Sequence, residues 1–274
     1  MKKEVKWANP ENFFAMFRCT TVQYAESFLN KGQIKFNTPD SWVKYAIENS
    51  EGRGDKFEGT MAMFDMLYDL EHIKELNEKY MKYSKLKRMK IDRSIYLKSE
   101  RDMLLPCFCF YILKNKMFKC PDVGGTHRLS TMVPASYFRD FMDNLEPCKV
   151  KKLDEKDKPA VIVVYNYKEF ENRIIKALMQ LGLKREEIII ARVSYLDFNY
   201  NTWWDFGQIP PLELAIKDIR FSSQSEGRII INTDDIKIKN ILEEPIEIGS
   251  LEDIASISKT YLYEGMKIDL TVDL

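Results

Sequence analysis

The sequence has few of the residues and motifs that catalytic triads and zinc sites require. It contains two histidines in 274 residues, His72 and His127, and neither lies near a recognisable nucleophile motif, so a Ser-His-Asp triad has few candidates. No Cys-x-x-Cys pair and no His-x-x-x-His spacing occurs. The cysteines are therefore better explained as buried apolar residues than as zinc ligands. We expect no metal site.

Long apolar runs and an excess of either charge are also missing. The longest apolar stretch, residues 104–113, is far shorter than the roughly 20 residues that span a membrane. The 42 basic and 42 acidic residues cancel, so no overall field attracts nucleic acid or an acidic membrane. Five cysteines, an odd number, fit a reducing compartment better than a disulfide framework. These features predict a soluble, cytoplasmic protein without a membrane partner.

Short apolar runs alternate with amphipathic segments along most of the chain. Residues 13–19 predict a strand, residues 21–31 a helix that Gly32 ends, and residues 34–36 a second strand. Residues 38–60, with a proline and several glycines, predict a long loop that carries function. Later segments continue the alternation, with strands predicted at 104–113, 127–133, 159–166, 187–196, 218–221, 228–232 and 236–239 and helices at 134–145 and 170–181.

The predicted fold class is α+β in a single domain that covers residues 1–274. We expect a twisted mixed sheet, mostly antiparallel, with a β-rich C-terminal third and a helical insertion at about residues 61–103. The insertion is predicted because Met61–Met103 contains neither glycine nor proline and is rich in Met, Leu, Lys and Glu. One continuous helix of that length would extend about 65 Å, which favours a two-helix lobe.

The second half of that insertion is strongly basic. Between Lys79 and Arg101 there are nine Lys or Arg residues and two acids. They predict either the solvated surface of a helix or a docking face for an acidic protein partner, with nucleic acid as the alternative. Trp203-Trp204, in a turn-rich segment, either closes the core or offers an aromatic platform for a partner or a base.

A short polar turn precedes one of the most apolar strands. Gln224-Ser225-Glu226 is followed by the strand-like run Ile229–Ile231. A glutamate fixed at the mouth of a sheet can stabilise positive charge that develops on a sugar. Arg18, on the first predicted strand, has the planar fork that matches phosphate oxygens. The structural alternatives are a loop in which Glu226 pairs with Arg228, and an Arg18 that pairs with a carboxylate.

The order of these motifs resembles that of the arginine-type ADP-ribosyltransferases. That family has Arg on the first strand, a Ser-Thr pair on a central strand, and Gln-x-Glu or Glu-x-Glu on a late turn that enters a strand. The corresponding residues here are Arg18, Ser130-Thr131 and Gln224-Ser225-Glu226. The chain also resembles a group of uncharacterised bacterial and phage proteins with an Asp-x-Phe-Glu loop, here Asp55 to Glu58.

The resemblance implies NAD as the substrate that supplies the ADP-ribosyl group. It implies that Glu226 and Gln224 are catalytic and that Arg18, Ser130 and Thr131 bind NAD. The expected function is ADP-ribosyl transfer in a bacterial or phage conflict system. The alternatives are a non-catalytic interaction protein that inhibits a host defence complex, and a nucleotide-binding module. The oligomeric state is left open, with a homo-oligomer as one possibility.

Overall fold

The fold is α+β, as predicted, in a computed structural model that describes residues 12–49, 54–65, 86–91, 94–119, 128–141, 146–198, 211–259 and 264–271. Its centre is a six-stranded antiparallel sheet in the order β14-β8-β1-β6-β12-β9. The six strands are β1 (Phe13–Thr21), β6 (Cys107–Lys114), β8 (Pro159–Val164), β9 (Ile188–Arg192), β12 (Glu226–Ile231) and β14 (Ala255–Ser258).

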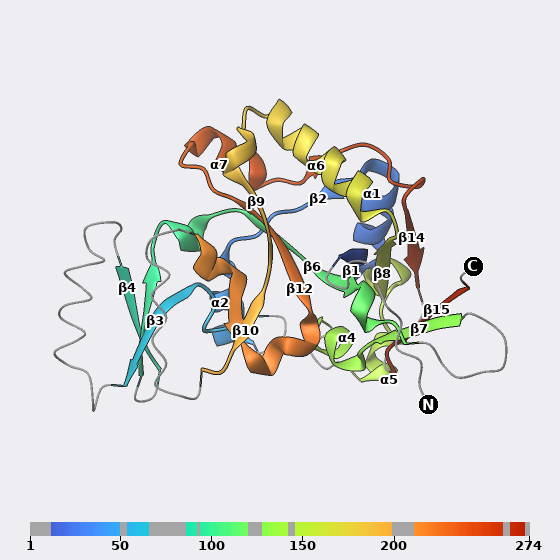
Figure 1. Cartoon of the computed structure of the whole chain (residues 1–274), viewed down its shortest axis with the longest axis horizontal. Helices are drawn as coiled ribbons and strands as arrows, with labels where there is room; N and C mark the ends of the chain where they lie inside the picture. Colours follow the sequence, from blue (N-terminus) through green and yellow to red (C-terminus); the bar gives the residue numbers. More distant parts are fainter. Residues whose placement is uncertain are drawn as a thin grey trace.

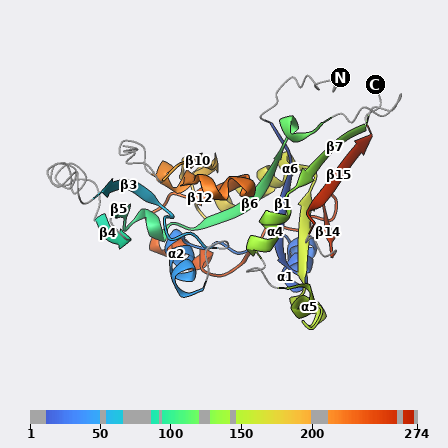
Figure 2. The same cartoon turned by 90° about the horizontal axis from the view of Figure 1, so that it is seen from below.

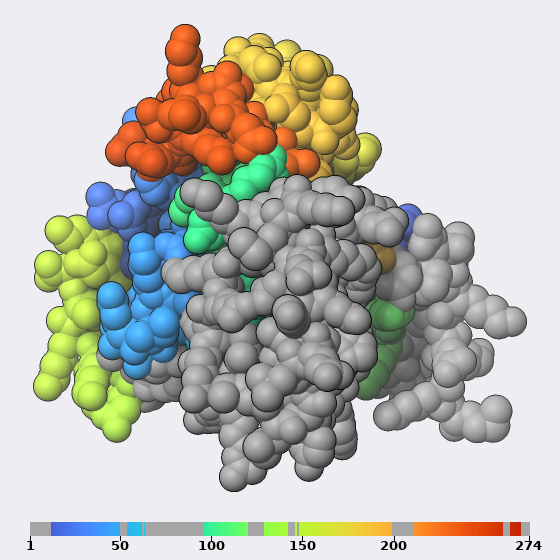
Figure 3. All heavy atoms as spheres, turned by 90° about the vertical axis from the view of Figure 1, so that its left-hand side faces the viewer, coloured from blue at the N-terminus to red at the C-terminus, as the bar shows by residue number. Residues whose placement is uncertain are grey.

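Helices cover one face of this sheet. Helices α1 (Val22–Lys31), α6 (Tyr167–Gln180) and α7 (Ile236–Leu242) bury their apolar sides against it (Figure 1). Figure 3 shows α7 in orange and α6 in yellow at one end of the molecule, above α2 (Pro39–Glu48) in blue. Because the inward strand residues alternate with outward ones, the opposite face carries a second apolar cluster.

The second face is covered by α4 (Ala135–Phe141) and by the antiparallel pair β7 (Arg128–Val133) and β15 (Met266–Thr271). Smaller elements complete the structure. They are α5 (Pro147–Val150), the antiparallel pair β2 (Gln33–Ile34) and β13 (Ile246–Glu247), and the parallel pair β10 (Ser194–Leu196) and β11 (Ile216–Asp218). None of the described helices is both long and apolar enough to cross a membrane.

Gly32 ends α1, as the sequence predicts, and its backbone shows why the position favours glycine. Its φ is 62°, in the left-handed region, and its N–H donates to the Phe28 carbonyl over 2.9 Å. A Cβ added here would lie 2.2 Å from the main-chain oxygen of Gly249. Both the backbone conformation and the close approach of a second main chain therefore exclude larger residues.

Replacing Gly32 with alanine is expected to lower the free energy of unfolding by about 2–4 kcal/mol, from backbone strain and from the clash with Gly249. Gly249→Ala is the matched control, because its φ is also positive, at 91°, but nothing lies within 4 Å of the added Cβ. The control should lose only about 1–2 kcal/mol. Urea denaturation of both variants measures the difference, and equal losses would contradict the role of the close contact.

The insertion at residues 61–103 forms strands where the structure describes it, apart from the 3₁₀ turn Asp102–Leu104, so the prediction of a helical lobe is wrong there. Strands β3 (Thr60–Asp65), β5 (Ser94–Ser99) and β4 (Leu86–Ile91) form a three-stranded antiparallel sheet. Residues 66–85 lie outside the described residues. Figures 1 and 2 place this sheet and the β7–β15 pair at opposite ends of the molecule.

Tertiary packing explains that error. A segment without glycine or proline can form either a helix or a strand, because helix propensities differ by less than about 1 kcal/mol per residue among ordinary residues. Tyr96 on β5 and Met63 on β3 are buried with Phe57 and Phe198. This cluster joins residues distant in sequence, so burial of the cluster decided the structure.

Three other segments differ from the prediction. The predicted loop at 38–60 contains α2, which Thr38 caps by accepting from the Ser41 N–H; proline at the first helical position is a start signal. The predicted strand at 236–239 is the beginning of α7, where the Asp235 carboxylate accepts from two main-chain N–H groups. The predicted strand at 218–221 is mostly a 3₁₀ segment, Ile219–Gln224.

The central sheet forks between β1 and β6. Their pairing runs from Phe13↔Lys114 to Phe17↔Tyr111 and stops there. Beyond that point β1 pairs with β8 as far as Thr21, and β6 pairs with β12 as far as Cys107. Two neighbouring strands therefore part within one sheet and leave a gap between their arms.

Candidate functional site

A cleft of about 380 Å³ lies at the fork. Arg18 and Cys19 line it from the β1 arm, and Cys109 and Phe110 line it from the β6 arm. Helices α2 and α4 and the start of β12 supply further walls, and Asn37, Glu58, Lys217 and Gln224 complete the lining. The cleft is thus a product of the strand register, because both arms would be occupied by main-chain hydrogen bonds if β1 and β6 stayed paired.

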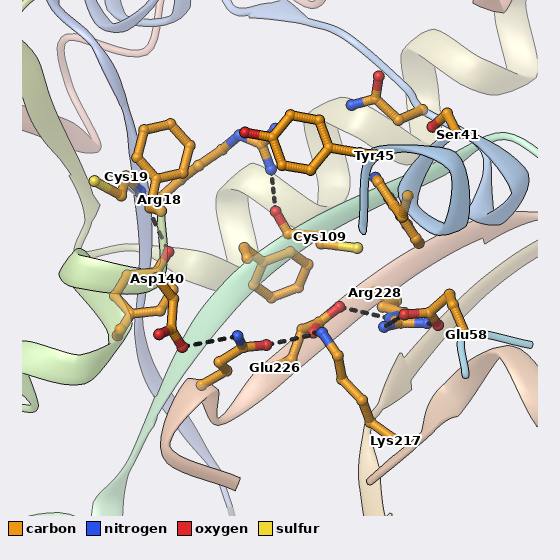
Figure 4. Close-up of a pocket in the computed structure, with 16 residues that line it drawn as sticks. Arg18, Cys19, Ser41, Tyr45, Glu58, Cys109, Asp140, Lys217, Glu226 and Arg228 are labelled. Atoms are coloured by element: carbon orange, nitrogen blue, oxygen red, sulfur yellow. Dashed lines mark hydrogen bonds and ion pairs between the residues drawn. The ribbon is translucent and has the colours of Figure 1, made fainter. Parts of the chain in front are cut away.

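Arg18 reaches across the fork. Its guanidinium donates to the main-chain carbonyl of Cys109 on the other arm, and its Cζ lies 4.3 Å from the centre of the Phe108 ring. Figure 4 shows Arg18 and Glu226 on either side of the β6 ribbon. The planar group is therefore oriented by both an acceptor and an aromatic face, and it lies at the wall of the cleft.

Glu226 begins β12 and is held by two cations. Its Oε1 accepts from Arg228 Nε over 2.6 Å, and its Oε2 accepts from Lys217 Nζ over 2.9 Å. Glu226 and Arg228 are two residues apart on one strand, so their side chains share a face. Lys217 approaches from β11, and all three side chains are buried.

The ionic network extends to the Asp-x-Phe-Glu loop. The fully buried Arg228 guanidinium donates to both carboxylate oxygens of Glu58 and to the main-chain carbonyl of Leu214. This two-point contact fits the fork of a guanidinium to the two oxygens of a carboxylate. In the same loop, Asp55 accepts from the Phe57 N–H over 2.8 Å. The loop is therefore tied to the turn that begins β12.

Gln224 links the network to α4. Its Oε1 accepts from Lys217 Nζ over 2.8 Å, and its Nε2 donates to the Asp140 carboxylate over 3.1 Å. Between Gln224 and Glu226, Ser225 adopts a left-handed φ of 39° and donates through Oγ to the Ile112 carbonyl. The turn is thus fixed at its centre and at both polar ends, and Figure 4 shows the contacts from Asp140 to Glu58.

Charge compensation sets the ionisation of the network. Burial alone would raise the pKa of Glu226, but the adjacent charges of Arg228 and Lys217 outweigh it and hold this pKa well below its ordinary value. Burial opposes the charge of Lys217 and Arg228, while Glu226 and Glu58 raise the pKa of both. Glu226 is therefore a carboxylate at neutral pH, between two cations.

Asp55 is ionised less readily than Glu226. Burial, and then the negative charge of Glu58, raise the pKa of Asp55 to about 6, although Lys217 and the Phe57 N–H partly oppose the increase. Burial likewise raises the pKa of Asp140, against the effects of Gln224 and Lys217. Asp140, in the wall of the cleft, and Asp55, outside its lining, are thus two carboxyls with raised pKa values in the surroundings of the anionic Glu226.

Three of the five predicted site residues meet in this cleft. Arg18, Gln224 and Glu226 line it together. Ser130 and Thr131 do not line it. They lie on β7, where they pair with Asp269 and Ile268 of β15, and Ser130 also exchanges main-chain hydrogen bonds with Lys119. A Ser-Thr pair within a strand is compatible with many sheet positions, so the motif did not specify its place in space.

Lys217 and Asp140 are site residues that no motif in the sequence indicated. Lys217 carries a signal in retrospect, because it directly follows the apolar run Leu214–Ile216 in "LAIKDI", a pattern that extends a buried segment to a cation. Asp140 carries none, because it lies on the polar side of an amphipathic helix. The alternative that Glu226 pairs with Arg228 is correct, and this pairing coexists with a place in the cleft.

The predicted basic face is distributed over different environments. Lys87, Arg88 and Lys90 lie on β4. Lys98 is buried and donates to the Lys56 carbonyl over 2.7 Å, while Arg101 contacts two aspartates. These residues do not share one helical face, which corrects the prediction. Lys79, Lys82, Lys85 and Trp203-Trp204 lie outside the described residues, so docking through this region stays a prediction.

Comparison with known proteins gave no match: no protein-family model matches the chain, and no curated protein or solved structure resembles it significantly. Among the described residues, no group of three or more His, Cys, Asp or Glu side chains is placed to hold a metal ion. Evidence for the function therefore comes from the geometry and the charges of the cleft.

Glu213 and Asp102 form a buried acidic pair. Glu213 belongs to the 3₁₀ turn Leu212–Ala215 and is buried beside Asp102. Burial, and then the negative charge of Asp102, raise the pKa of Glu213 to about 8, with Arg101 opposing the increase. Arg101 itself is paired with Asp102 and Asp234. At neutral pH the Glu213 carboxyl therefore keeps its proton in the folded state.

This protonation predicts a protein that loses stability as the pH rises. The folded pKa is raised above the unfolded value, so unfolding releases a proton at any pH between the two, and higher pH favours the unfolded chain. From pH 6.5 to 8 the free energy of unfolding should fall by about 2 kcal/mol. Glu213→Gln should remove most of this slope. Urea titrations at both pH values measure it, and parallel slopes in the two proteins would contradict the assignment.

Proposed function

We propose that this protein binds NAD in the cleft at the sheet fork and cleaves its bond between nicotinamide and ribose, as ADP-ribosyltransferases do. One observation carries the proposal. Arg18 and Glu226, far apart in sequence, line the same cleft, and Glu226 is kept as a carboxylate by its two cationic neighbours. Phosphate recognition and stabilisation of sugar charge are thus available within one site.

Arg18 supplies the phosphate contact in this proposal. Its guanidinium is already oriented at the wall of the cleft by Cys109 and Phe108. A pyrophosphate that accepts from it would exchange a carbonyl acceptor for a charged one, which makes a stronger hydrogen bond. Tyr45, Phe110 and Tyr137 also line the cleft, and such rings suit the planar adenine or nicotinamide.

Glu226 supplies the contact that strengthens during the reaction. When the glycosidic bond breaks, its electron pair leaves with nicotinamide and positive charge develops at C1 of the ribose. A carboxylate that accepts from a ribose hydroxyl stabilises that charge more in the transition state than in the ground state. Oε1 of Glu226 accepts from Arg228 and Oε2 accepts from Lys217, and carboxylate oxygens have lone pairs for a further donor.

Gln224 and Asp140 lie where an acceptor would enter. The attacking group, water or a protein nucleophile, forms the new bond to C1 and must lose a proton. Asp140, with its raised pKa, is the nearest carboxyl to Gln224 and is suited to take that proton. Gln224 then orients the acceptor while its own carbonyl remains bound to Lys217.

The test is nicotinamide release from NAD by the purified protein, beside calorimetry for NAD binding. Arg18→Ala should weaken NAD binding about 10-fold or more, because a charge-assisted phosphate contact is worth about 1.5–3 kcal/mol, and it should change turnover at saturation much less. Lys176→Ala, an exposed change on α6, is the control. A folded wild-type protein that neither binds NAD nor releases nicotinamide would rule the proposal out.

The completeness of the ionic network favours one alternative. The network contains two buried carboxylates and two buried cations that neutralise one another, Glu226, Glu58, Arg228 and Lys217. A network with a purely structural role would have the same composition. In that case the cleft would be a nucleotide-binding module without chemistry. The same experiment separates the two, because NAD and ADP-ribose would then bind with no release of nicotinamide.

A further inference from the structure

The turn Gln224–Glu226 already binds a cation that belongs to the protein itself. The Lys217 ammonium donates to Gln224 Oε1 over 2.8 Å and to Glu226 Oε2 over 2.9 Å. Lys217 is buried, and its Nζ lies 5.0 Å from the centre of the Phe221 ring, so the ammonium is held from a third side. An incoming group at this turn would therefore have to share its acceptor atoms with an internal cation.

This contact disfavours a guanidinium as the group that receives ADP-ribose. A guanidinium has only donors, so it must find acceptor atoms at the turn. Gln224 Oε1 accepts from Lys217, and the Glu226 carboxylate accepts from Lys217 and Arg228. Both of these cations would also repel a further positive charge at short range. An uncharged acceptor fits the turn better.

Burial of the turn limits the size of the acceptor. Gln224 and Glu226 each expose only 8% of their surface. Ser225, between them, donates through Oγ to the Ile112 carbonyl and accepts from the Ile112 N–H, each over 2.8 Å. The volume of the cleft, about 380 Å³, is near the lower end of the range of about 300–1,000 Å³ that ligand pockets occupy. With a dinucleotide bound, a small molecule fits beside the turn better than a side chain of another protein.

Asp140 is placed to activate a small acceptor. Its Oδ2 accepts from Gln224 Nε2 over 3.1 Å, and it lines the same cleft as Glu226 (Figure 4). A carboxylate has several lone pairs, so it can also accept from a water molecule. Burial raises the pKa of Asp140, which makes it a stronger base than a fully hydrated carboxylate. Glu226 is less suited, because Arg228 and Lys217 outweigh burial and keep its pKa well below its ordinary value.

We propose that water is the acceptor, an inference that rests on the NAD-cleaving function proposed above, so that the protein hydrolyses NAD to ADP-ribose and nicotinamide. The bond between C1 of the ribose and the nicotinamide nitrogen breaks, and its electron pair leaves with nicotinamide. The water oxygen forms the new bond to C1, and its proton passes to Asp140 and then to solvent. The products are ADP-ribose, nicotinamide and one proton, so atoms and charges balance.

Product analysis with the whole protein and NAD tests the choice of water. Chromatography should show nicotinamide and free ADP-ribose in equal amounts, and agmatine, a small guanidine, should leave this ratio unchanged. Radiolabelled NAD should leave no label on the protein. A wild-type protein that releases no nicotinamide would contradict the function proposed for the cleft. Nicotinamide release with ADP-ribose attached to agmatine or to protein would overturn only the choice of water.

Asp140→Asn tests the base. Asparagine can still accept from Gln224 but cannot take a proton, so the hydrolysis rate should fall about 100-fold or more while NAD binding is nearly retained. Azide, a small anion that needs no deprotonation, should restore nicotinamide release by this variant and yield ADP-ribosyl azide. Asp157→Asn, an exposed change, is the matched control and should keep the wild-type rate. An Asp140→Asn rate equal to wild type, or a loss that azide does not restore, would overturn the role of Asp140.

Discussion

Arg228→Met is expected to reduce the free energy of unfolding by about 3–5 kcal/mol, the largest effect of any single change considered for this protein. Arg228 is fully buried and compensates two buried carboxylates, Glu58 and Glu226. Methionine fills much of the space but leaves both carboxylates without their main cation. Because uncompensated buried charge is costly, the loss should greatly exceed that of an ordinary ion pair.

Arg173→Met is the matched control for this change. Arg173 also bridges two carboxylates, Glu169 and Asp253, but these are 40% and 60% exposed and hydrated. Its loss should cost about 1 kcal/mol or less per pair. Guanidinium chloride denaturation of both variants gives the comparison. Similar losses would mean that water reaches the network around Arg228. The buried network would then stabilise the fold no more than exposed ion pairs do.

The double variant Arg228→Met with Glu58→Gln refines the same prediction. Glu226 keeps its contact with Lys217 when Arg228 is replaced, whereas Glu58 loses its contact with the guanidinium. Removing the charge of Glu58 should therefore make the double variant more stable than the sum of the two single losses predicts. A double-mutant cycle gives this coupling, which should lie at about 1–3 kcal/mol for residues in direct contact. Simple additivity would indicate that the bidentate contact contributes little.

Glu226→Gln is expected to lower the rate of nicotinamide release by about 100- to 1,000-fold, the size of effect seen when one transition-state contact is removed. NAD binding should be nearly retained, because the contact matters most when charge develops on the sugar. The neutral amide also compensates Lys217 and Arg228 less well, so stability should fall too. Rates must therefore be measured well below the melting temperature and normalised to the folded fraction.

Glu58→Gln separates catalysis from stability. Glu58 belongs to the same network, through Arg228, and its neutralisation should destabilise the fold to a similar extent. Its carboxylate binds Arg228, which links it to Glu226, so its effect on the rate per folded molecule should be much smaller. If Glu58→Gln and Glu226→Gln reduce the rate equally, the network acts as a unit and Glu226 has no separate role at the sugar.

Much of the local structure could be predicted from single segments. Strand β1, helix α1 and its end at Gly32 follow from a short apolar run, an amphipathic pattern and a glycine, and each depends on neighbours in sequence. The same holds for β6 and β12. The segment 60–103 shows the limit, because its composition suited a helix while contacts with Phe57 and Phe198 stabilised strands.

The candidate site was predictable only in part, because its residues come from distant segments. Local sequence specifies which side chains are available, among them the planar guanidinium of Arg18 and a Gln-x-Glu turn in front of an apolar strand. Tertiary structure decided that β1 and β6 separate after Phe17, that Arg228 and Lys217 compensate Glu226, and that Ser130 lies in another sheet. The physical reason is that strand register and the pairing of buried charges depend on the whole set of competing partners, and no local pattern encodes that competition.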